Sequence, residues 1–154
     1  MTIPNSKSGA SLPRAESGPE RVVQRMQELA RYIDEHAAEA LPLAQLGRRA
    51  HLSPTHLQRT FKAIVGVSPK AYQDAARLKQ LKSGLKSGKS VIDAIGEAGF
   101  ESTSRVYGHA PRSLGMTPSA YRSGGAGERI VHAYRRTALG PLLMAATERG
   151  VCFA

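Results

Sequence analysis

The stretch PTHLQRTFK, residues 54–62, gathers side chains that can form directional hydrogen bonds. Arg59 carries a planar guanidinium that can donate two parallel bonds to guanine, and Gln58 can pair in the same two-point manner with adenine. Lys62 is a point charge suited to a phosphate oxygen. Thr55 and His56 complete this polar set. On an isolated helix all five would be ordinary solvated side chains, so their interpretation depends on the elements that hold them.

Other residue types that carry chemistry are scarce. Cys152 is the single cysteine, which excludes an internal disulfide and any cysteine-rich zinc site. It lies between Val151 and Phe153, so we expect a buried structural thiol on an apolar strand. No Ser/His/Asp order, Gly-rich phosphate loop or paired carboxylates stand out, and we predict no catalytic residue, metal or cofactor. The histidines lack the same-face spacing of metal ligands: His36, His51, His56, His109 and His132.

Two Ser-Pro pairs organise the first half of the chain. Ser53 and Ser68 can each cap a helix whose first turn holds the following proline. Gly66, between them, can take the left-handed conformation that ends a helix. Ser17 and Glu20 have the spacing of a capping box for an earlier helix. Four helices are predicted in this half: 18–37, a short one opened by Pro42, one from Pro54 to the stop at Gly66, and 69–86. The inward residues are Leu43, Leu46 and Ala50 in the second helix and Leu57, Phe61 and Ile64 in the third.

The second half continues with capped helices and then changes character. Ser90 and Asp93 have capping-box spacing before a helix that ends at Gly99. A further helix is expected from about Ser102 to His109, with a kink or early end at Pro111. The last helix starts at Thr117-Pro118. From 129 onward, β-forming residues divided by Gly140-Pro141 and by residues 148–150 predict two or three strands of a meander.

The chain also repeats itself. GVSPKAY at 66–72 returns as GMTPSAY at 115–121, an offset of 49 residues. Each copy follows two short helices, so we predict two helix-turn-helix motifs joined by the rigid 69–86 helix. Such a motif leaves the outer face of its second helix free for the major groove of DNA. In the first motif this face holds Thr55, His56, Gln58, Arg59 and Lys62. In the second motif it holds Thr103, Ser104, Arg105 and Tyr107, which have fewer long donors and should read less sequence.

The charge supports a polyanionic partner. The chain has a formal net charge of +10, and residues 41–126 hold 13 Lys/Arg against 4 Asp/Glu. Nearly all the excess charge is therefore localised on the two motifs, which argues against a generally basic surface. No run of about 18 apolar residues is present, so we predict no membrane span. The first 17 residues have no apolar stretch of signal-peptide type.

The motif residues resemble a known family. HLSPTHLQRTFKAIVGVSPKAY, 51–72, and LGMTPSAYR, 114–122, are similar to the AraC/XylS family of transcription activators, over about 41–122. The resemblance implies two helix-turn-helix motifs joined by a long helix, and DNA as the partner. His51 stands where that family usually has glycine in the first turn, so a positive φ is expected there.

The flanks sharpen the resemblance. The segment after 123, with LGPLLMAATERGVC at 139–152, resembles the Ada family of alkylation-response regulators, in which such a unit precedes an alkyltransferase domain. That family accepts methyl groups on a four-cysteine zinc domain and on a later Pro-Cys-His motif. This chain contains neither motif, so the resemblance implies a regulator region that is not itself an enzyme.

These observations lead to one interpretation with two alternatives. We expect a mainly α chain: a disordered leader, 1–17, an AraC-type double helix-turn-helix domain, 18–124, and a short C-terminal β-meander, 125–154, from a truncated alkyltransferase-like domain. Its function would be sequence-specific transcription activation linked to alkylation damage. It would act as a monomer that binds two successive major-groove segments of double-stranded DNA, with RNA polymerase as a further partner. Its location would be the bacterial cytoplasm, at the nucleoid. The alternatives are a fragment of a DNA-repair methyltransferase and a non-specific DNA-coating protein.

Overall fold

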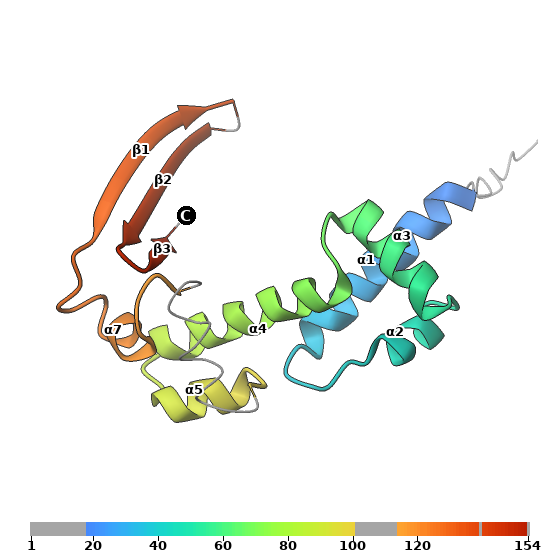
Figure 1. The fold of residues 1–154 in the computed structure, drawn as a ribbon, viewed down its shortest axis with the longest axis horizontal. Coiled ribbons are helices and arrows are strands. Elements are labelled where there is room, and N and C mark those ends of the chain that lie inside the picture. Colours follow the sequence, from blue (N-terminus) through green and yellow to red (C-terminus); the bar gives the residue numbers. More distant parts are fainter. Residues whose placement is uncertain (1–17, 101–113, 139, 154) are drawn as a thin grey trace, which may run out of the picture.

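The computed structural model describes residues 18–100, 114–138 and 140–153, and its described part is mainly helical (Figure 1). This confirms the predicted fold class, including the long connecting helix and the C-terminal meander. The helices are α1 Gly18–Glu35, α2 Leu43–Arg49, α3 Pro54–Val65, α4 Pro69–Lys86, α5 Val91–Glu97 and α7 Pro118–Arg122. The strands are β1 Val131–Thr137, β2 Gly140–Thr147 and β3 Gly150–Phe153.

Helix starts follow the predicted capping chemistry. At the N-caps of α3, α4, α5 and α7 a hydroxyl accepts a bond from the backbone N–H three residues on, which satisfies one of the donors left free in the first turn, whereas α2 starts after Pro42 without a side-chain cap. Gly66 ends α3 at a φ of 92°, as the left-handed stop requires. The caps are Ser53 with His56 (3.4 Å), Ser68 with Ala71 (3.2 Å), Ser90 with Asp93 (3.1 Å) and Thr117 with Ala120 (3.2 Å).

Some sequence predictions differ from the structure or lie outside it. α1 ends at Glu35, not at residue 37, because the chain turns there and the Glu39 amide bonds the His36 carbonyl at 2.9 Å. Ser17, the expected cap of α1, lies outside the described residues, as do the expected 102–109 helix and Pro111. Helix ends commonly shift by one or two residues in this way.

Two hydrophobic clusters form the core, one at each end of α4. The first unites α1, α2 and α3; its most buried members are Met26, Ile33, Leu57 and Phe61, and Leu46 joins them from α2. The second joins α4 and α5; it contains Leu81, Leu85, Ala94, Ile95, Ala98 and Leu114. α4 has 18 residues, hence a length of about 27 Å, and runs between the clusters as one uninterrupted helix (Figure 1). Each helix-turn-helix unit therefore has its own core, and α4 fixes their separation.

A polar clamp fastens the loop after α1 to α4. Gln73, which is 4% exposed, donates from Nε2 to the carbonyls of Ala37 at 3.0 Å and Glu39 at 2.7 Å. Arg77, one turn on, donates to the same two carbonyls, from Nε at 2.7 Å and from Nη2 at 2.9 Å. Each carbonyl thus accepts two bonds. Because this loop leads into α2, the clamp sets where the first motif begins.

A second contact between α1 and α4 involves Tyr72. Its hydroxyl donates to Asp34 Oδ2 at 2.9 Å, and its ring meets that of Phe61 edge to face at 5.7 Å. Burial of the phenol raises the pKa of Tyr72, and the bond to the Asp34 carboxylate and its negative charge raise it further. The neutral hydroxyl is therefore the form that the fold favours.

Gly99 brings the second unit against the same loop. Its φ is 75°, and a Cβ at this position would overlap the backbone of Ala38. Only glycine allows this close approach without a shift of the loop. The end of α5 thus packs on the segment that the clamp holds, so the two units share one junction.

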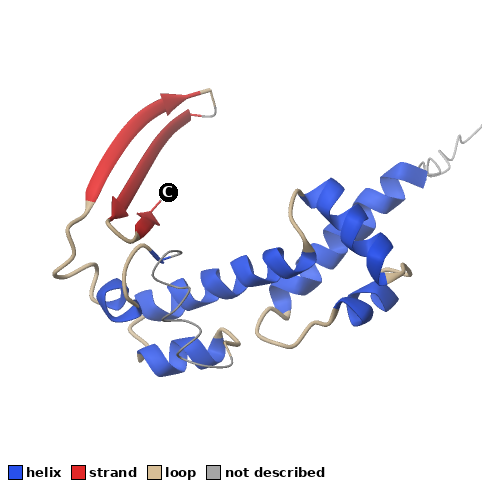
Figure 2. Cartoon of the chain, viewed as in Figure 1, coloured by secondary structure: helices blue, strands red, loops and turns tan. Residues whose placement is uncertain are grey.

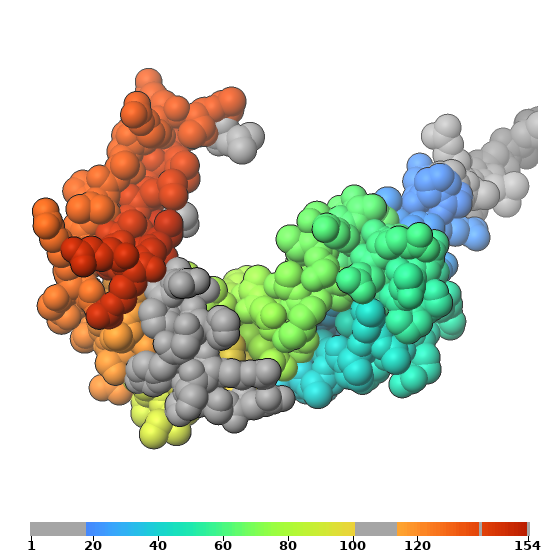
Figure 3. All heavy atoms as spheres, in the orientation of Figure 1, coloured from blue at the N-terminus to red at the C-terminus, as the bar shows by residue number. Residues whose placement is uncertain are grey.

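The C-terminal strands form an antiparallel sheet in the order β1-β2-β3, with a register shift at Ala145/Ala146. Figures 2 and 3 show it as an arm that leaves the helical body. Thr147 Oγ1 donates to the Gly115 carbonyl, and a Cβ at Gly115 would lie 2.6 Å from the Gly150 carbonyl oxygen. The sheet is therefore anchored at the start of α7, through β2 and β3.

The prediction of a buried Cys152 is wrong. The thiol is half-buried, and its strand neighbours Val151 and Phe153 are 42% and 52% exposed. The physical reason is that the described helices cover little of this sheet, so strand residues with apolar side chains remain open to solvent. Large exposed apolar residues of the arm are Val131, Tyr134, Leu142, Leu143 and Met144.

Candidate nucleic-acid interface

The turn between α2 and α3 sets the orientation of the candidate helix. His51 has a φ of 52°, which confirms the expected positive φ, and its amide bonds the Arg48 carbonyl at 3.1 Å. The Leu52 amide then bonds the Gly47 carbonyl at 2.9 Å. Gly47 is buried, and a Cβ there would lie 2.7 Å from the Leu52 carbonyl oxygen. The tight turn therefore depends on a glycine inside α2 and on a left-handed histidine.

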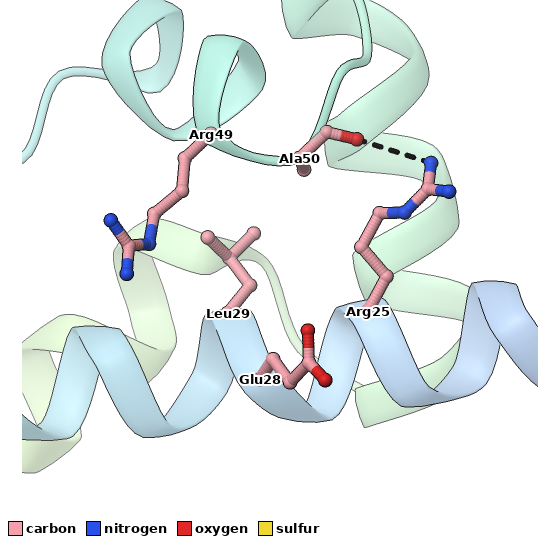
Figure 4. A pocket seen from close by; sticks show the side chains of 5 residues that line it. All are labelled: Arg25, Glu28, Leu29, Arg49 and Ala50. Atoms are coloured by element: carbon pink, nitrogen blue, oxygen red, sulfur yellow. Dashed lines mark hydrogen bonds between the residues drawn. The ribbon is translucent and has the colours of Figure 1, made fainter.

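α1 supports this turn from behind (Figure 4). Arg25 Nη1 donates to the Ala50 carbonyl at 3.3 Å, and Leu29 packs in the cluster between the two helices. On the next turn of α1, the Tyr32 ring lies 3.9 Å from the Arg49 guanidinium carbon, a cation–π geometry. A pocket of about 310 Å³ remains among Arg25, Glu28 and Arg49. These contacts hold α2 and α3 as a unit on α1.

α3 has one buried face and one free face. Leu57 and Phe61 are fully buried against the first cluster. At 100° per residue, Thr55, Arg59 and Lys62 lie within roughly 40° of the direction opposite Leu57. Gln58 and His56 lie on opposite flanks of this row, about 80° from its centre. All five predicted residues are exposed on α3. The two flanks differ, because Gln58 also lines a groove of about 530 Å³ toward the start of α4, beside Ser68 and Lys70.

The five side chains are also uncommitted. Within the described residues, none of them forms a side-chain hydrogen bond or ion pair. Two other surface lysines are neutralised: Lys70 pairs with Asp74 at 2.5 Å, and Lys89 pairs with Glu97. An exposed cationic row without internal partners is free to contact an external one.

The second predicted set, Thr103, Ser104, Arg105 and Tyr107, lies outside the described residues. The elements that bracket it are described. Gly99 ends α5 before it, and Gly115, with a φ of 71°, precedes the Thr117 cap of α7 after it. Gly115 and Thr117 repeat the arrangement of Gly66 and Ser68. The glycine with a positive φ and the capped helix start of each copy are therefore repeated in the described structure as well as in the sequence.

The residues that position the site carry no local signal in the sequence, with one exception. Gln73 and Arg77 bond a loop more than thirty residues away, and Arg25 bonds the turn from a separate helix. No local pattern marks such contacts. One signal was available for Gly47: glycine is unfavourable inside a helix, so its presence in α2 indicates a close approach.

Other kinds of site have little support in the described ranges. Across 18–100, 114–138 and 140–153, no group of three or more His, Cys, Asp or Glu could hold a metal ion. No described helix is both long and apolar enough to cross a membrane. The free row on α3 is thus the feature of this part of the chain that most calls for a partner.

Comparisons with known proteins agree with this geometry. The chain is 40% identical over 110 residues to the "Regulatory protein ada" of Salmonella typhimurium and 41% identical over 110 residues to the "Bifunctional transcriptional activator/DNA repair enzyme Ada" of Escherichia coli K12. Each match covers 71% of this chain but 31% of the relative, so the chain spans less than a third of their length. A crystal structure of the DNA-binding domain of AdpA, in complex with a target DNA, is similar with a TM-score of 0.60 and 29% identity, over 65% of this chain and 91% of that one.

A family model described as "Helix-turn-helix domain" matches residues 46–124, half of the chain. That span runs from α2 through α7 and contains both copies of the repeat. Together with the tight α2–α3 turn, the free face of α3 and the connecting helix α4, the match leads to one conclusion: the chain belongs to the AraC-type helix-turn-helix family.

Proposed function

We propose that this chain is a sequence-specific, DNA-binding transcription regulator. The carrying observation is the free face of α3: its side chains can read bases or hold phosphates, it lies opposite a buried face, and α1 fixes the turn before it. Arg59 would bond a guanine edge, Gln58 an adenine edge and Lys62 a phosphate. Thr55 and His56 would contact neighbouring sugar or base edges. No cofactor is needed for this binding, and its place would be the bacterial cytoplasm.

The two units would bind successive segments of one duplex. α4 is about 27 Å long and carries one unit near each end, so the two units can face successive major-groove segments about one helical turn apart. We therefore propose a monomer on an asymmetric site, with Thr103, Ser104, Arg105 and Tyr107 at the second segment. Footprinting together with mass measurement tests this; a requirement for a dimer on a palindrome would contradict it.

The decisive experiment compares variants on selected and scrambled DNA at fixed salt. Arg59→Ala should cost about 1–3 kcal/mol on the selected site and relax preference at one base pair, whereas Lys62→Ala should weaken both DNAs alike. Ser104→Ala should cost less specificity than Arg59→Ala. Arg31→Ala removes one exposed charge on α1 and is the control for charge alone, so its loss of affinity should be small and equal on the two DNAs. Equal losses on both DNAs for Arg59→Ala would refute base reading by α3.

A salt titration separates specific regulation from general charge attraction. Contacts to roughly six to ten phosphates give a slope of about −0.9 per contact in a log–log plot of affinity against salt. A slope near zero would refute the nucleic-acid proposal. Selective binding that survives at high salt would exclude a non-specific coating protein.

We propose further that the regulated response is to alkylation damage, and that this chain itself transfers no methyl group. The first part is supported by the two Ada relatives and the second by Cys152, which has no cationic or histidine partner among the described residues. Methyl acceptance needs an activated thiolate beside a base. RNA polymerase is the further partner that an activator implies.

A further inference from the structure

A second cationic surface lies on α4, away from the recognition helix. Lys79, Lys82 and Lys86 follow one another at i, i+3 and i+7, so they form one row on the helix. We call this the α4 lysine row. Within the described residues none of the three has an acidic partner, in contrast to Lys70 and Lys89. Like charges at this spacing destabilise a helix, and an external anion on the row would relieve this repulsion.

The row borders a groove with an apolar floor. The groove has a volume of about 520 Å³, and Ala75, Leu78 and Tyr121 line it together with the three lysines. Tyr121 comes from α7, and Lys86 Nζ lies 5.9 Å from its ring centre. The site is therefore built from two elements, α4 and α7, which lie side by side in Figure 1. It offers a central apolar surface with positive charge along one side.

This combination distinguishes between two polyanions. A sugar-phosphate backbone would satisfy the lysines but would leave the apolar floor without a matching group. An acidic amphipathic helix satisfies both, because its carboxylates can repeat at three and four residues, as the lysines do, while its apolar row enters the groove. We propose that the α4 lysine row and its groove bind an acidic, amphipathic segment of a protein partner.

The row also lies on a different face of α4 from the clamp. At 100° per residue, Lys79, Lys82 and Lys86 lie roughly 140–180° from Arg77, which faces the loop after α1. Occupation of this face would therefore leave the clamp and both cores in place. A protein partner could bind while α3 remains available, so this site is independent of the proposed function at α3.

The test uses a short fluorescein-labelled helical peptide with a leucine row flanked by glutamates, and measures its binding by anisotropy. The row variant is Lys79→Gln/Lys82→Gln. The control is Arg31→Gln/Lys89→Gln, which removes the same charge from an exposed position on α1 and from the pair with Glu97. Gln has nearly the helix propensity of Lys, so both variants should fold, which circular dichroism checks.

The proposal expects the peptide to bind the unaltered chain, to lose about tenfold in affinity for the row variant and to lose less than about threefold for the control. A peptide with glutamine in place of glutamate, or serine in place of leucine, should bind about tenfold more weakly than the parent. Equal losses for the two variants, or no binding to the unaltered chain, would overturn the proposal.

A parallel titration with duplex DNA gives the remaining outcome. Both variants should lose DNA affinity equally, because they remove equal charge. A larger loss for the row variant would assign the surface to DNA phosphates and overturn the proposal. If the unaltered chain showed no preference for selected over scrambled DNA, the proposed function at α3 would be refuted instead. Failure of the α4 proposal and failure of the proposed function are therefore distinguishable.

Discussion

The clamp on α4 makes a quantitative prediction about coupling. The Ala37 and Glu39 carbonyls each accept one bond from Gln73 and one from Arg77. Gln73→Met or Arg77→Met removes two of these four bonds but leaves each carbonyl with one donor. At about 0.5–1.5 kcal/mol per bond, each single variant should lower the free energy of unfolding by about 1–3 kcal/mol.

The double variant should be worse than the sum of the singles. It leaves both carbonyls without a side-chain donor, but only Ala37 is buried; the exposed Glu39 can bond water. One orphaned buried carbonyl costs a further 1–3 kcal/mol or so, which is the expected coupling energy. The effect arises because methionine keeps the length of the side chains but cannot donate.

Urea denaturation followed by circular dichroism measures the free energy of unfolding of the unaltered chain, the two single variants and the double variant. Equal slopes of this free energy against urea concentration check that the unfolded states are comparable. Lys70→Gln and Asp74→Asn provide a reference cycle at an exposed ion pair, where the coupling should stay below about 1 kcal/mol. Additivity of the clamp variants to within about 0.5 kcal/mol would show that water replaces the donors and would refute the reasoning.

Further predictions concern the junction, the phenol and the thiol. Gly99→Ala should lower the free energy of unfolding by about 2 kcal/mol or more, because the φ of Gly99 is positive and an added Cβ would overlap the backbone of Ala38. Gly96→Ala should raise the free energy of unfolding by about 0.5–1 kcal/mol, because Gly96 lies inside α5 with open space around it. Thermal melts compare the two variants. Because the folded pKa of Tyr72 is raised above 10.0, its stabilisation is complete below that pH and is lost as pH rises through the raised value; Tyr72→Phe should therefore show a flatter alkaline decline in its urea midpoint than the unaltered chain. Incubation with DNA carrying labelled methyl groups should leave no label on the protein, and label that disappears in Cys152→Ser would contradict this.

Local signals in the sequence predicted the helices well. The Ser-Pro pairs at 53–54 and 68–69 form caps because a hydroxyl three residues before a free amide is a purely local geometry. Gly66 ends α3 for an equally local reason, its tolerance of positive φ. The repeat of these features at Gly115 and Thr117 is why one pattern was sufficient to propose two motifs.

Long-range contacts could not be predicted in the same way. Gln73 looks like any polar residue of a helix, yet it is buried because two carbonyls from a distant loop meet it. The exposure of Cys152 could not be predicted either, because apolar neighbours in the sequence do not determine burial, which depends on what covers the sheet. For the site, the α3 residues followed from helical periodicity and are exposed on the helix as expected, but their contacts with DNA stay predictions.

The continuity of α4 has a consequence for how binding sites can vary. Since the helix runs unbroken between the two cores, each residue added to it would rotate the second unit by about 100° and shift it by about 1.5 Å relative to the first. One inserted residue would turn the second unit away from the duplex, and only changes near a whole number of turns would restore its direction. The junction of Gly99 with Ala38 would be lost at the same time. The number of residues in α4 thus determines the spacing of the DNA segments that one molecule can join. This spacing can change only in steps of about one helical turn of α4, not gradually.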